Sequence, residues 1–226
     1  MRRSILVLCV VACGFGCMGA LPGIVSASPL LTYPTGTALP VKALLKATNM
    51  GNIRIADGSG SVLYECTNSM LTGELTKNSG SEVEATISTA DFGGTAGGGS
   101  ACTSAFGTPS TTTGPPTITG GTPWCLRATS KMAADAFEIR GGACSEASRS
   151  IRYVLDGAGC AYRRTEPLKG TLTTDTGASS DAVLSLVEQS FTRESGAGLL
   201  CPAEYRWNIN YTLETDKSTA EPLYLS

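Results

Sequence analysis

Residues 160–201 read CAYRRTEPLKGTLTTDTGASSDAVLSLVEQSFTRESGAGLLC, and residues 66–102 read CTNSMLTGELTKNSGSEVEATISTADFGGTAGGGSAC. Each stretch opens on a cysteine, continues with a Leu-x-Gly-x-Leu-Thr motif and ends on a second cysteine. In both, a phenylalanine precedes the closing cysteine by ten residues, and an aliphatic residue precedes that phenylalanine by five. This recurrence predicts an internal duplication of one disulfide-stapled β-module.

The two copies also agree in the phase of their alternating apolar residues. Because successive side chains of a strand point to opposite faces, the inward positions can be aligned on Phe92 and Phe191. The aligned inward residues are Val83 with Ala182, Ala85 with Leu184, and Ile87 with Leu186. Glu188 falls on the same inward phase, so the strand of the second copy is predicted to bulge or leave the sheet there.

The most regular strand pattern lies at residues 205–215. Its apolar positions alternate with polar ones and are Tyr205, Trp207, Ile209, Tyr211 and Leu213. One apolar face opposite one polar face is typical of a half-buried strand, so the apolar face is expected to be core. The alternative is an exposed ligand platform of Tyr205, Trp207 and Tyr211, on which a sugar could stack.

Similar alternation elsewhere predicts an all-β protein, and no stretch has sustained helical periodicity. The expected strands are residues 41–47, 52–56, 61–66, 73–76, 82–89, 136–140, 150–155, 169–174, 182–191 and 205–215. Residues 103–122 are rich in Gly, Pro and Thr and are interpreted as a linker. The predicted architecture is therefore two tandem β-sandwich or barrel-like modules, residues 28–102 and 123–226, joined by that linker.

The N-terminus has the pattern of a secretory signal peptide. Two arginines precede an apolar run, and residues 25–27 supply a cleavage site, which predicts a signal peptide at residues 1–27. The alternative is a lipoprotein anchor on Cys13. Cleavage after Ala27 leaves six cysteines, whereas cleavage before Cys13 would leave Cys17 unpaired. The even set favours export, either into the medium or to the cell envelope, without a lipid anchor or a remaining membrane span.

The repeat also predicts how the six remaining cysteines pair. If the pairing recurs in each copy, the bridges are Cys66–Cys102 and Cys160–Cys201, which leaves Cys125 to pair with Cys144. The repeat and the Gly- and Thr-rich composition resemble the uncharacterised secreted β-proteins that are common in actinobacteria. The resemblance rests on residues 66–102 and 160–201, and it implies export and fold class without implying a function.

The bulk composition excludes several classes of function. The chain has 17 basic and 19 acidic side chains and no histidine. This mildly acidic balance is a poor match to nucleic acid or to an anionic membrane surface. Without histidine, Ser-His-Asp and Cys-His catalysis and histidine-ligated zinc are excluded. No Cys-x-x-Cys pair is present, so neither a metal nor a cofactor is expected.

Two weaker signals point to hydrolase chemistry. The loop Asp175-Thr176-Gly177 resembles the active site of aspartic peptidases, but Thr174 replaces the apolar residue of that motif, and the first copy has no matching carboxylate. A hairpin turn explains the same residues. The glutamates that could supply a glycosidase acid and nucleophile are Glu65, Glu138, Glu146 and Glu166, and the sequence gives no means of pairing them.

From these observations we expect an exported, non-enzymatic protein with a binding or structural role at the cell envelope or outside the cell. Its partner would be a cell-wall glycan or another envelope protein. The alternative is a carboxylate-dependent hydrolase that acts on wall polysaccharide or peptide. A glycosidase needs two carboxylates roughly 5 to 10 Å apart in one cleft, so the placement of the glutamates distinguishes the two hypotheses.

Overall fold

A computed structural model describes residues 30–92, 102–104, 118–129, 132, 136–146, 149–155, 159–174, 182–196, 201–216 and 223–225. The predicted signal peptide at residues 1–27, with Cys13, lies outside these ranges, as do the Asp175-Thr176-Gly177 loop and residues 105–117 of the predicted linker. The described chain is all-β, as the alternation predicts. Its strands are β1 (Leu31–Thr32), β2 (Leu44–Asn49), β3 (Ile53–Asp57), β4 (Val62–Cys66), β5 (Ser69–Ser79), β6 (Glu82–Phe92), β7 (Thr103–Ser104), β8 (Ile118–Gly120), β9 (Trp124–Thr129), β10 (Ala136–Gly141), β11 (Ile151–Leu155), β12 (Cys160–Arg164), β13 (Leu168–Thr174), β14 (Ala182–Ser195), β15 (Glu204–Thr215) and β16 (Tyr224–Leu225).

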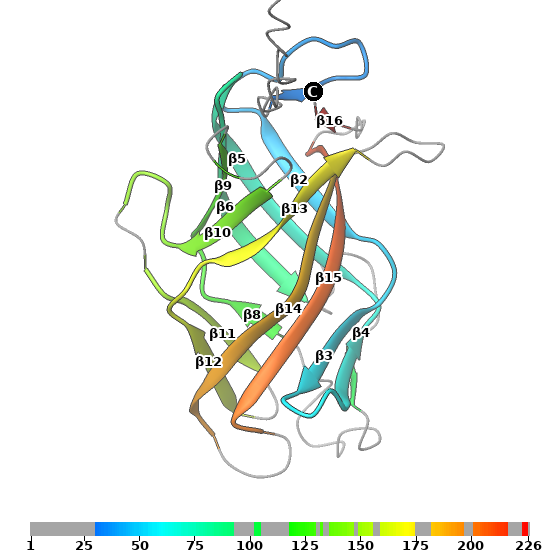
Figure 1. Ribbon diagram of the computed structural model, residues 1–226, viewed down its shortest axis with the longest axis vertical. Coiled ribbons are helices and arrows are strands. Elements are labelled where there is room, and N and C mark those ends of the chain that lie inside the picture. The colour runs from blue at the N-terminus through cyan, green and yellow to red at the C-terminus, as the bar shows by residue number, and fades with distance from the viewer. Residues whose placement is uncertain are drawn as a thin grey trace, which may run out of the picture.

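Eight of these strands close into an antiparallel barrel, which forms the upper part of the molecule in Figure 1. Around the barrel the order is β2, β5, β6, β9, β10, β13, β14 and β15, and β15 pairs again with β2. Closure removes the unpaired strand edges that an open sheet would expose. Strands of both predicted modules contribute to this single barrel, because β6 pairs with β9 and β15 pairs with β2.

The lower part of the molecule is built on the ends of the long barrel strands (Figure 1). There β15 pairs with β3, β14 pairs with β12, and β6 pairs with β8. β4 and β7 extend this sheet beyond β3, and β11 joins β8 to β12. On one edge, β6, β14 and β15 therefore each pair with one strand along their upper half and with another strand along their lower half.

Two glycines permit close contact between neighbouring strands of the barrel. A Cβ added at Gly73 would overlap the carbonyl oxygen of Thr86, and a Cβ at Gly170 would overlap that of Ser185. These glycines occupy the same position in the Leu-x-Gly-x-Leu-Thr motif of the two copies. Only glycine fits where backbones approach so closely, which gives the motif a structural reason.

The core changes character from the barrel to the lower sheet. Inside the barrel the buried side chains are mainly aliphatic, including Val83, Ile87 and Leu184. In the lower part the buried side chains are mainly aromatic and include Tyr64, Phe92, Tyr153, Tyr162, Phe191, Tyr205 and Trp207. The inward phase predicted for both copies is confirmed, because the six aligned residues are all buried.

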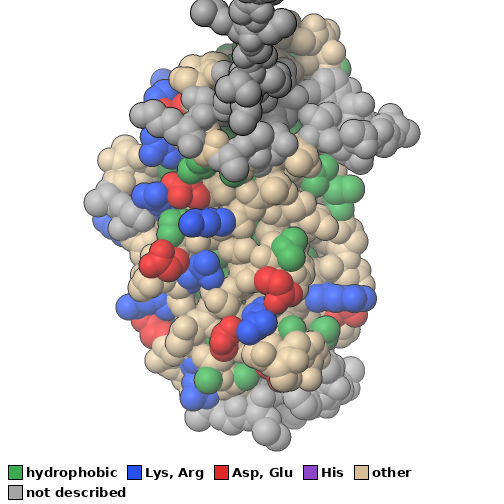
Figure 2. Space-filling model, in the orientation of Figure 1, with side chains coloured by type: hydrophobic (Ala, Val, Ile, Leu, Met, Phe, Trp, Pro, Cys, Tyr) green, Lys and Arg blue, Asp and Glu red, His purple; other side chains and the backbone are tan. Residues whose placement is uncertain are grey.

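Charges of alternating sign lie directly opposite one another on five strands of the barrel. Lys77 on β5 is opposite Glu84 on β6, which is opposite Arg127 on β9. Arg127 is in turn opposite Glu138 on β10, and Glu138 is opposite Lys169 on β13. Such opposite-charge pairs stabilise neighbouring strands by about 0.2 to 1 kcal/mol each. Figure 2 shows the same mixing of acidic and basic side chains on the face that it presents.

The predicted irregularity at Glu188 is confirmed. The pairing of β14 with β15 shifts register between Leu186 and Gln189, and Glu188 has a φ of 52°. The inward phase of the alternating pattern would have placed the Glu188 carboxylate in the core, and this β-bulge turns it outward instead. The first predicted strand needs correction, because Lys42 has a φ of 72° and β2 begins only at Leu44. Val41, which shares the alternating phase of the buried Leu45 and Ala47, is exposed.

Three disulfides staple the fold, and their pairs are those that the cysteine spacing predicts. Cys66 is joined to Cys102, Cys125 to Cys144, and Cys160 to Cys201. The four cysteines of the first and third bridges are buried, whereas Cys125 and Cys144 are partly exposed. A set of three disulfides is consistent with an oxidising or extracellular environment.

Candidate functional site

The aromatic face of β15 is core and does not form a ligand platform. Tyr205, Trp207 and Tyr211 are 0%, 1% and 1% exposed. The ring of Trp207 lies 4.4 Å from that of Phe191 and 4.6 Å from that of Tyr153, measured between centroids. A stacked sugar needs an exposed ring face, so the platform alternative does not hold for these three residues.

The interior of the barrel is also filled. Within the described residues, the cavity among its aliphatic side chains measures about 30 Å³. A volume of this size is too small for a ligand, because small-molecule sites usually measure about 300 to 1,000 Å³. The two described cavities that are large enough for a small molecule lie away from this aliphatic interior.

Two larger cavities do lie outside, each at a place where a long strand changes its neighbour. β14 pairs with β13 up to Ser185 and with β12 from Thr192 onward, and a cavity of about 500 Å³ lies beside this change. β15 pairs with β3 up to Asn208 and with β2 from Tyr211, and a second cavity of about 380 Å³ lies there. We refer to them as the β14 cavity and the β15 cavity.

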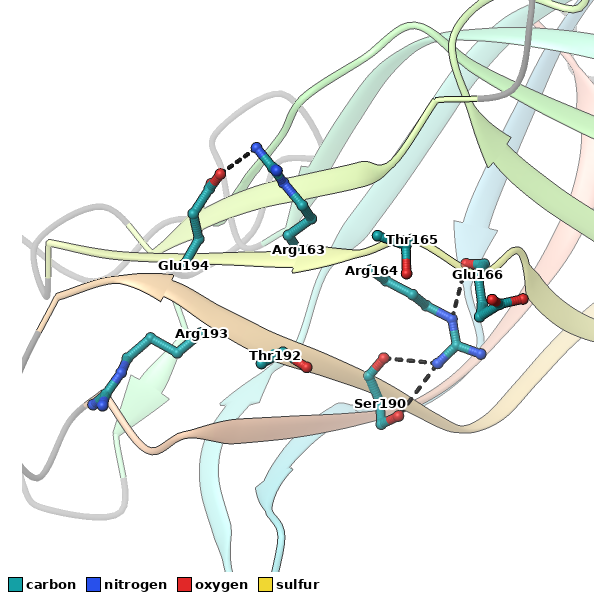
Figure 3. Close-up of a pocket in the computed structure, with 8 residues that line it drawn as sticks. All are labelled: Arg163, Arg164, Thr165, Glu166, Ser190, Thr192, Arg193 and Glu194. Atoms are coloured by element: carbon teal, nitrogen blue, oxygen red, sulfur yellow. Dashed lines mark hydrogen bonds and ion pairs between the residues drawn. The ribbon is translucent and has the colours of Figure 1, made fainter.

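Arg164, the last residue of β12, reaches across the change of neighbours in the β14 cavity (Figure 3). Its Nη1 donates to Ser190 O at 2.7 Å and to Ser190 Oγ at 3.3 Å. Its Nε donates to Glu166 O at 3.1 Å and to Pro167 O at 3.3 Å. The guanidinium is thus fixed by neutral acceptors where strand pairing stops. Partial burial lowers the pKa of Arg164, although a guanidinium stays charged at neutral pH.

An ion-pair cluster forms the opposite end of the β14 cavity (Figure 3). Glu194 accepts a hydrogen bond from Arg152 Nε at 2.5 Å and pairs with Arg163 on the neighbouring strand. The hydrogen bond from Arg152 and the charges of both arginines hold the pKa of Glu194 below its ordinary value. Arg193 points away from this pair in Figure 3 and donates to the carbonyl oxygen of Cys201. Glu194 is consequently ionised and fully engaged.

The β15 cavity is lined mainly by amides and by exposed apolar side chains. Its lining residues are Met50, Asn52, Arg54, Val187, Asn208, Ile209 and Asn210. Two of the amides already have partners: Asn208 Nδ2 donates to Glu188 Oε1 at 2.9 Å, and Asn52 Nδ2 donates to Glu65 Oε1 at 3.0 Å. The guanidinium of Arg54 also pairs with Glu65. This cavity therefore offers fewer unengaged groups to a ligand.

The structure does not bring the four candidate glutamates together. Glu65 pairs with Arg54, Glu138 pairs with Arg140, and Glu146 pairs with Arg149, so each of these three carboxylates is held by its own arginine. Glu166 lines the β14 cavity, where it lies opposite Glu194 (Figure 3). The hydrogen bond from Asn52 and the Arg54 guanidinium lower the pKa of Glu65.

Among the described carboxyl groups, those whose pKa is shifted have it lowered by hydrogen bonds and, except at Asp57, by nearby cations, and they are Asp57, Glu65, Glu82 and Glu194. A glycosidase acid needs the opposite shift, because it must hold a proton near neutral pH. The described residues also contain no group of three or more acidic or cysteine side chains placed to hold a metal ion.

Apart from Glu166, the residues of the β14 cavity were not predicted to belong to a site. The available signal was the pair Arg163-Arg164 followed by Pro167, where adjacent arginines meet a residue that interrupts strand pairing. Nothing in the sequence placed these arginines beside Ser190 and Glu194.

Comparison with known proteins adds no further constraint. No helix in the described ranges has the length and apolar character needed to cross a membrane. No protein-family model, curated protein or solved structure matches this chain.

Proposed function

We propose that the protein is an exported, non-enzymatic binding protein of the cell envelope or the extracellular space, and that the β14 cavity is its binding site. The observation that carries this proposal is Arg164, a guanidinium held rigidly at the wall of a cavity of about 500 Å³ by four hydrogen bonds to neutral acceptors. Sites on strands of a stapled barrel are preorganised, so binding costs little ordering of the protein.

The alternative function, a carboxylate-dependent hydrolase, has less support. The β14 cavity contains two carboxylates, but Arg152 and Arg163 neutralise Glu194, whose lowered pKa suits neither an acid nor a base near neutral pH. Glu166 would have to act alone. We therefore propose Glu166 as a hydrogen-bond acceptor for a ligand, while Glu194 stays paired with the two arginines.

Export is part of the same proposal. It is supported by the N-terminal pattern of residues 1–27 and by the three disulfides, which persist in oxidising compartments. A partner in the cell wall would be a glycan or another envelope protein.

We also propose that the barrel arose by internal duplication. In support, Leu75 lies opposite Ala85 in the first half, and the matching Leu172 lies opposite Leu184 in the second. One difference is that Cys66 ends β4, whereas Cys160 begins β12. The two cysteines that match in spacing therefore lie at opposite ends of their strands, β4 and β12.

The test of the proposed function combines binding and turnover. Purified residues 28–226 are applied to a glycan array and to isolated cell-wall material, and the same preparation is assayed for release of reducing sugar and of peptide fragments. We expect retention on wall material without turnover. Turnover that disappears in Glu166→Gln would overturn the proposal in favour of the hydrolase.

A further inference from the structure

The β14 cavity has a local charge opposite to that of the whole chain. The chain carries a net charge of −2. Around the cavity, Arg152, Arg163, Arg164 and Arg193 outnumber Glu166 and Glu194. Glu194 is shared between Arg152 and Arg163, so it does not compensate Arg164. The surplus positive charge therefore centres on the Arg164 side of the cavity.

The donors of Arg164 are only partly used. Its Nε and Nη1 reach four neutral acceptors, and among the described residues Nη2 has no hydrogen-bond partner and no carboxylate lies within ion-pairing distance. The Glu166 carboxylate attracts Arg164 electrostatically without forming an ion pair, so a guanidinium partly removed from water still gains from an anion that completes its hydrogen bonds. Half-burial of Arg164 strengthens that attraction, because the local dielectric constant is lower than in water.

The rest of the wall suits hydroxyl groups. Thr165, Ser190 and Thr192 line the cavity with hydroxyls that both donate and accept, and the Glu166 carboxylate can accept. Its described lining residues include no aromatic ring, so they offer no matching surface to a stacked apolar ligand. An anion with hydroxyl groups beside its charge satisfies both halves of this wall.

From these contacts we infer that the β14 cavity binds a saccharide unit that carries a carboxylate or phosphate group, with the anionic group on Arg164 and the sugar hydroxyls on Glu166, Ser190 and the two threonines. This inference rests on the proposed binding function and specifies its ligand class. The anion would form charge-assisted hydrogen bonds with Nη2, while Nε and Nη1 keep the guanidinium in place.

Isothermal titration of residues 28–226 with glucuronate, glucose 6-phosphate, glucose and inorganic phosphate tests the ligand class. We expect saturable binding of glucuronate or glucose 6-phosphate that weakens with added salt. Glucose should bind at least about tenfold more weakly, since it lacks the charge. Equal affinities for glucose and glucuronate would overturn the role of Arg164. Inorganic phosphate that binds as tightly as glucose 6-phosphate would overturn the role of the hydroxyls.

A charge variant locates the site without disturbing the hydrogen bonds of Arg164. Thr165 is exposed beside Arg164, so Thr165→Glu places a competing carboxylate in the cavity and should weaken glucuronate binding at least about tenfold. Thr76→Glu makes the same change at an exposed position on β5, away from the cavity, and should leave binding unchanged. Equal binding by wild type and Thr165→Glu would refute the site.

The failure of this inference can be distinguished from the failure of the proposed function. If no anionic sugar binds but wall material still retains the protein, the ligand class is wrong and the binding function stands. If wall material retains neither wild type nor Thr165→Glu and no anionic sugar binds, both proposals are wrong.

Discussion

Replacing Trp207 by alanine should unfold the protein at a markedly lower denaturant concentration. Trp207 is 1% exposed and lies at the centre of the lower core, with ring centroids of Phe92, Tyr153 and Phe191 at 5.0, 4.6 and 4.4 Å. A buried aromatic removes about 150 to 250 Å² from water, which at about 25 cal/mol per Å² corresponds to roughly 4 to 6 kcal/mol. Measured truncations of buried Phe or Trp to alanine cost about 3 to 5 kcal/mol.

The buried indole N–H of Trp207 places the expected loss of unfolding free energy at the lower end of that range. Trp207 Nε1 is buried and has no hydrogen-bond partner among the described residues, so removing it relieves a desolvated donor. We therefore expect Trp207→Ala to lower the free energy of unfolding by about 3 kcal/mol, which is a large part of the 5 to 15 kcal/mol that is typical of native proteins. Trp207→Phe keeps an aromatic ring and removes the donor, and should cost less than about 1.5 kcal/mol.

Equilibrium urea unfolding with the disulfides intact provides the measurement, read by tryptophan fluorescence for wild type and by far-UV circular dichroism for all variants. Val187→Ala is the matched control, because Val187 is 60% exposed and its truncation should change stability by less than about 0.5 kcal/mol. An unchanged midpoint for Trp207→Ala would refute the placement of the β15 aromatic face in the core.

Three further predictions concern the barrel and its staples. Gly170→Ala should destabilise the protein by about 1 to 3 kcal/mol in urea unfolding, because a Cβ there would lie 2.7 Å from the Phe137 ring. The control Gly58→Ala, whose Cβ would find no atom closer than 3.8 Å, should change the stability little, and equal effects of the two variants would contradict the close packing at Gly170. The hydrogen bond from Lys77, with the Arg127 contact, lowers the pKa of Glu82. The stability that Glu82 contributes is therefore complete above its unfolded pKa of about 4.3 and is lost as the pH falls through its lower folded pKa. Between about pH 5 and pH 2, Glu82→Gln should lose less stability than wild type, and parallel curves of stability against pH would count against the pairing. Mild reduction followed by alkylation and peptide mapping should label Cys125 and Cys144 first, because only that bridge is partly exposed, and earlier labelling of Cys66 or Cys160 would contradict the burial of those bridges.

Local patterns in the sequence were sufficient to predict several elements. The alternation at residues 205–215 predicted both β15 and which of its faces is buried. The phase of residues 182–188 predicted the bulge at Glu188, since a carboxylate could not stay on the inward phase. β9 was missed although Trp124, Leu126 and Ala128 alternate inward, because this alternation covers only six residues directly after the Gly- and Pro-rich segment.

Barrel closure and the binding cavity could not be predicted in the same way. β15 pairs with β2 across Tyr211 and Asn49, residues far apart in the chain, and no local pattern specifies which strands become neighbours. The β14 cavity exists because β14 exchanges β13 for β12, so the role of Arg164 depends on that non-local choice. The same residue in a strand paired along its whole length would be an ordinary surface arginine.

Chemical-shift mapping of isotope-labelled residues 28–226 during titration with glucuronate tests the central claim most directly. We predict that the backbone amide signals that move lie in residues 163–166 and 190–194, which line the β14 cavity, and that Thr165→Glu abolishes the movement. Shifts centred on residues 50–54 and 208–210 would assign the ligand to the β15 cavity and contradict the account. A complete lack of shifts at saturating glucuronate would contradict it as well.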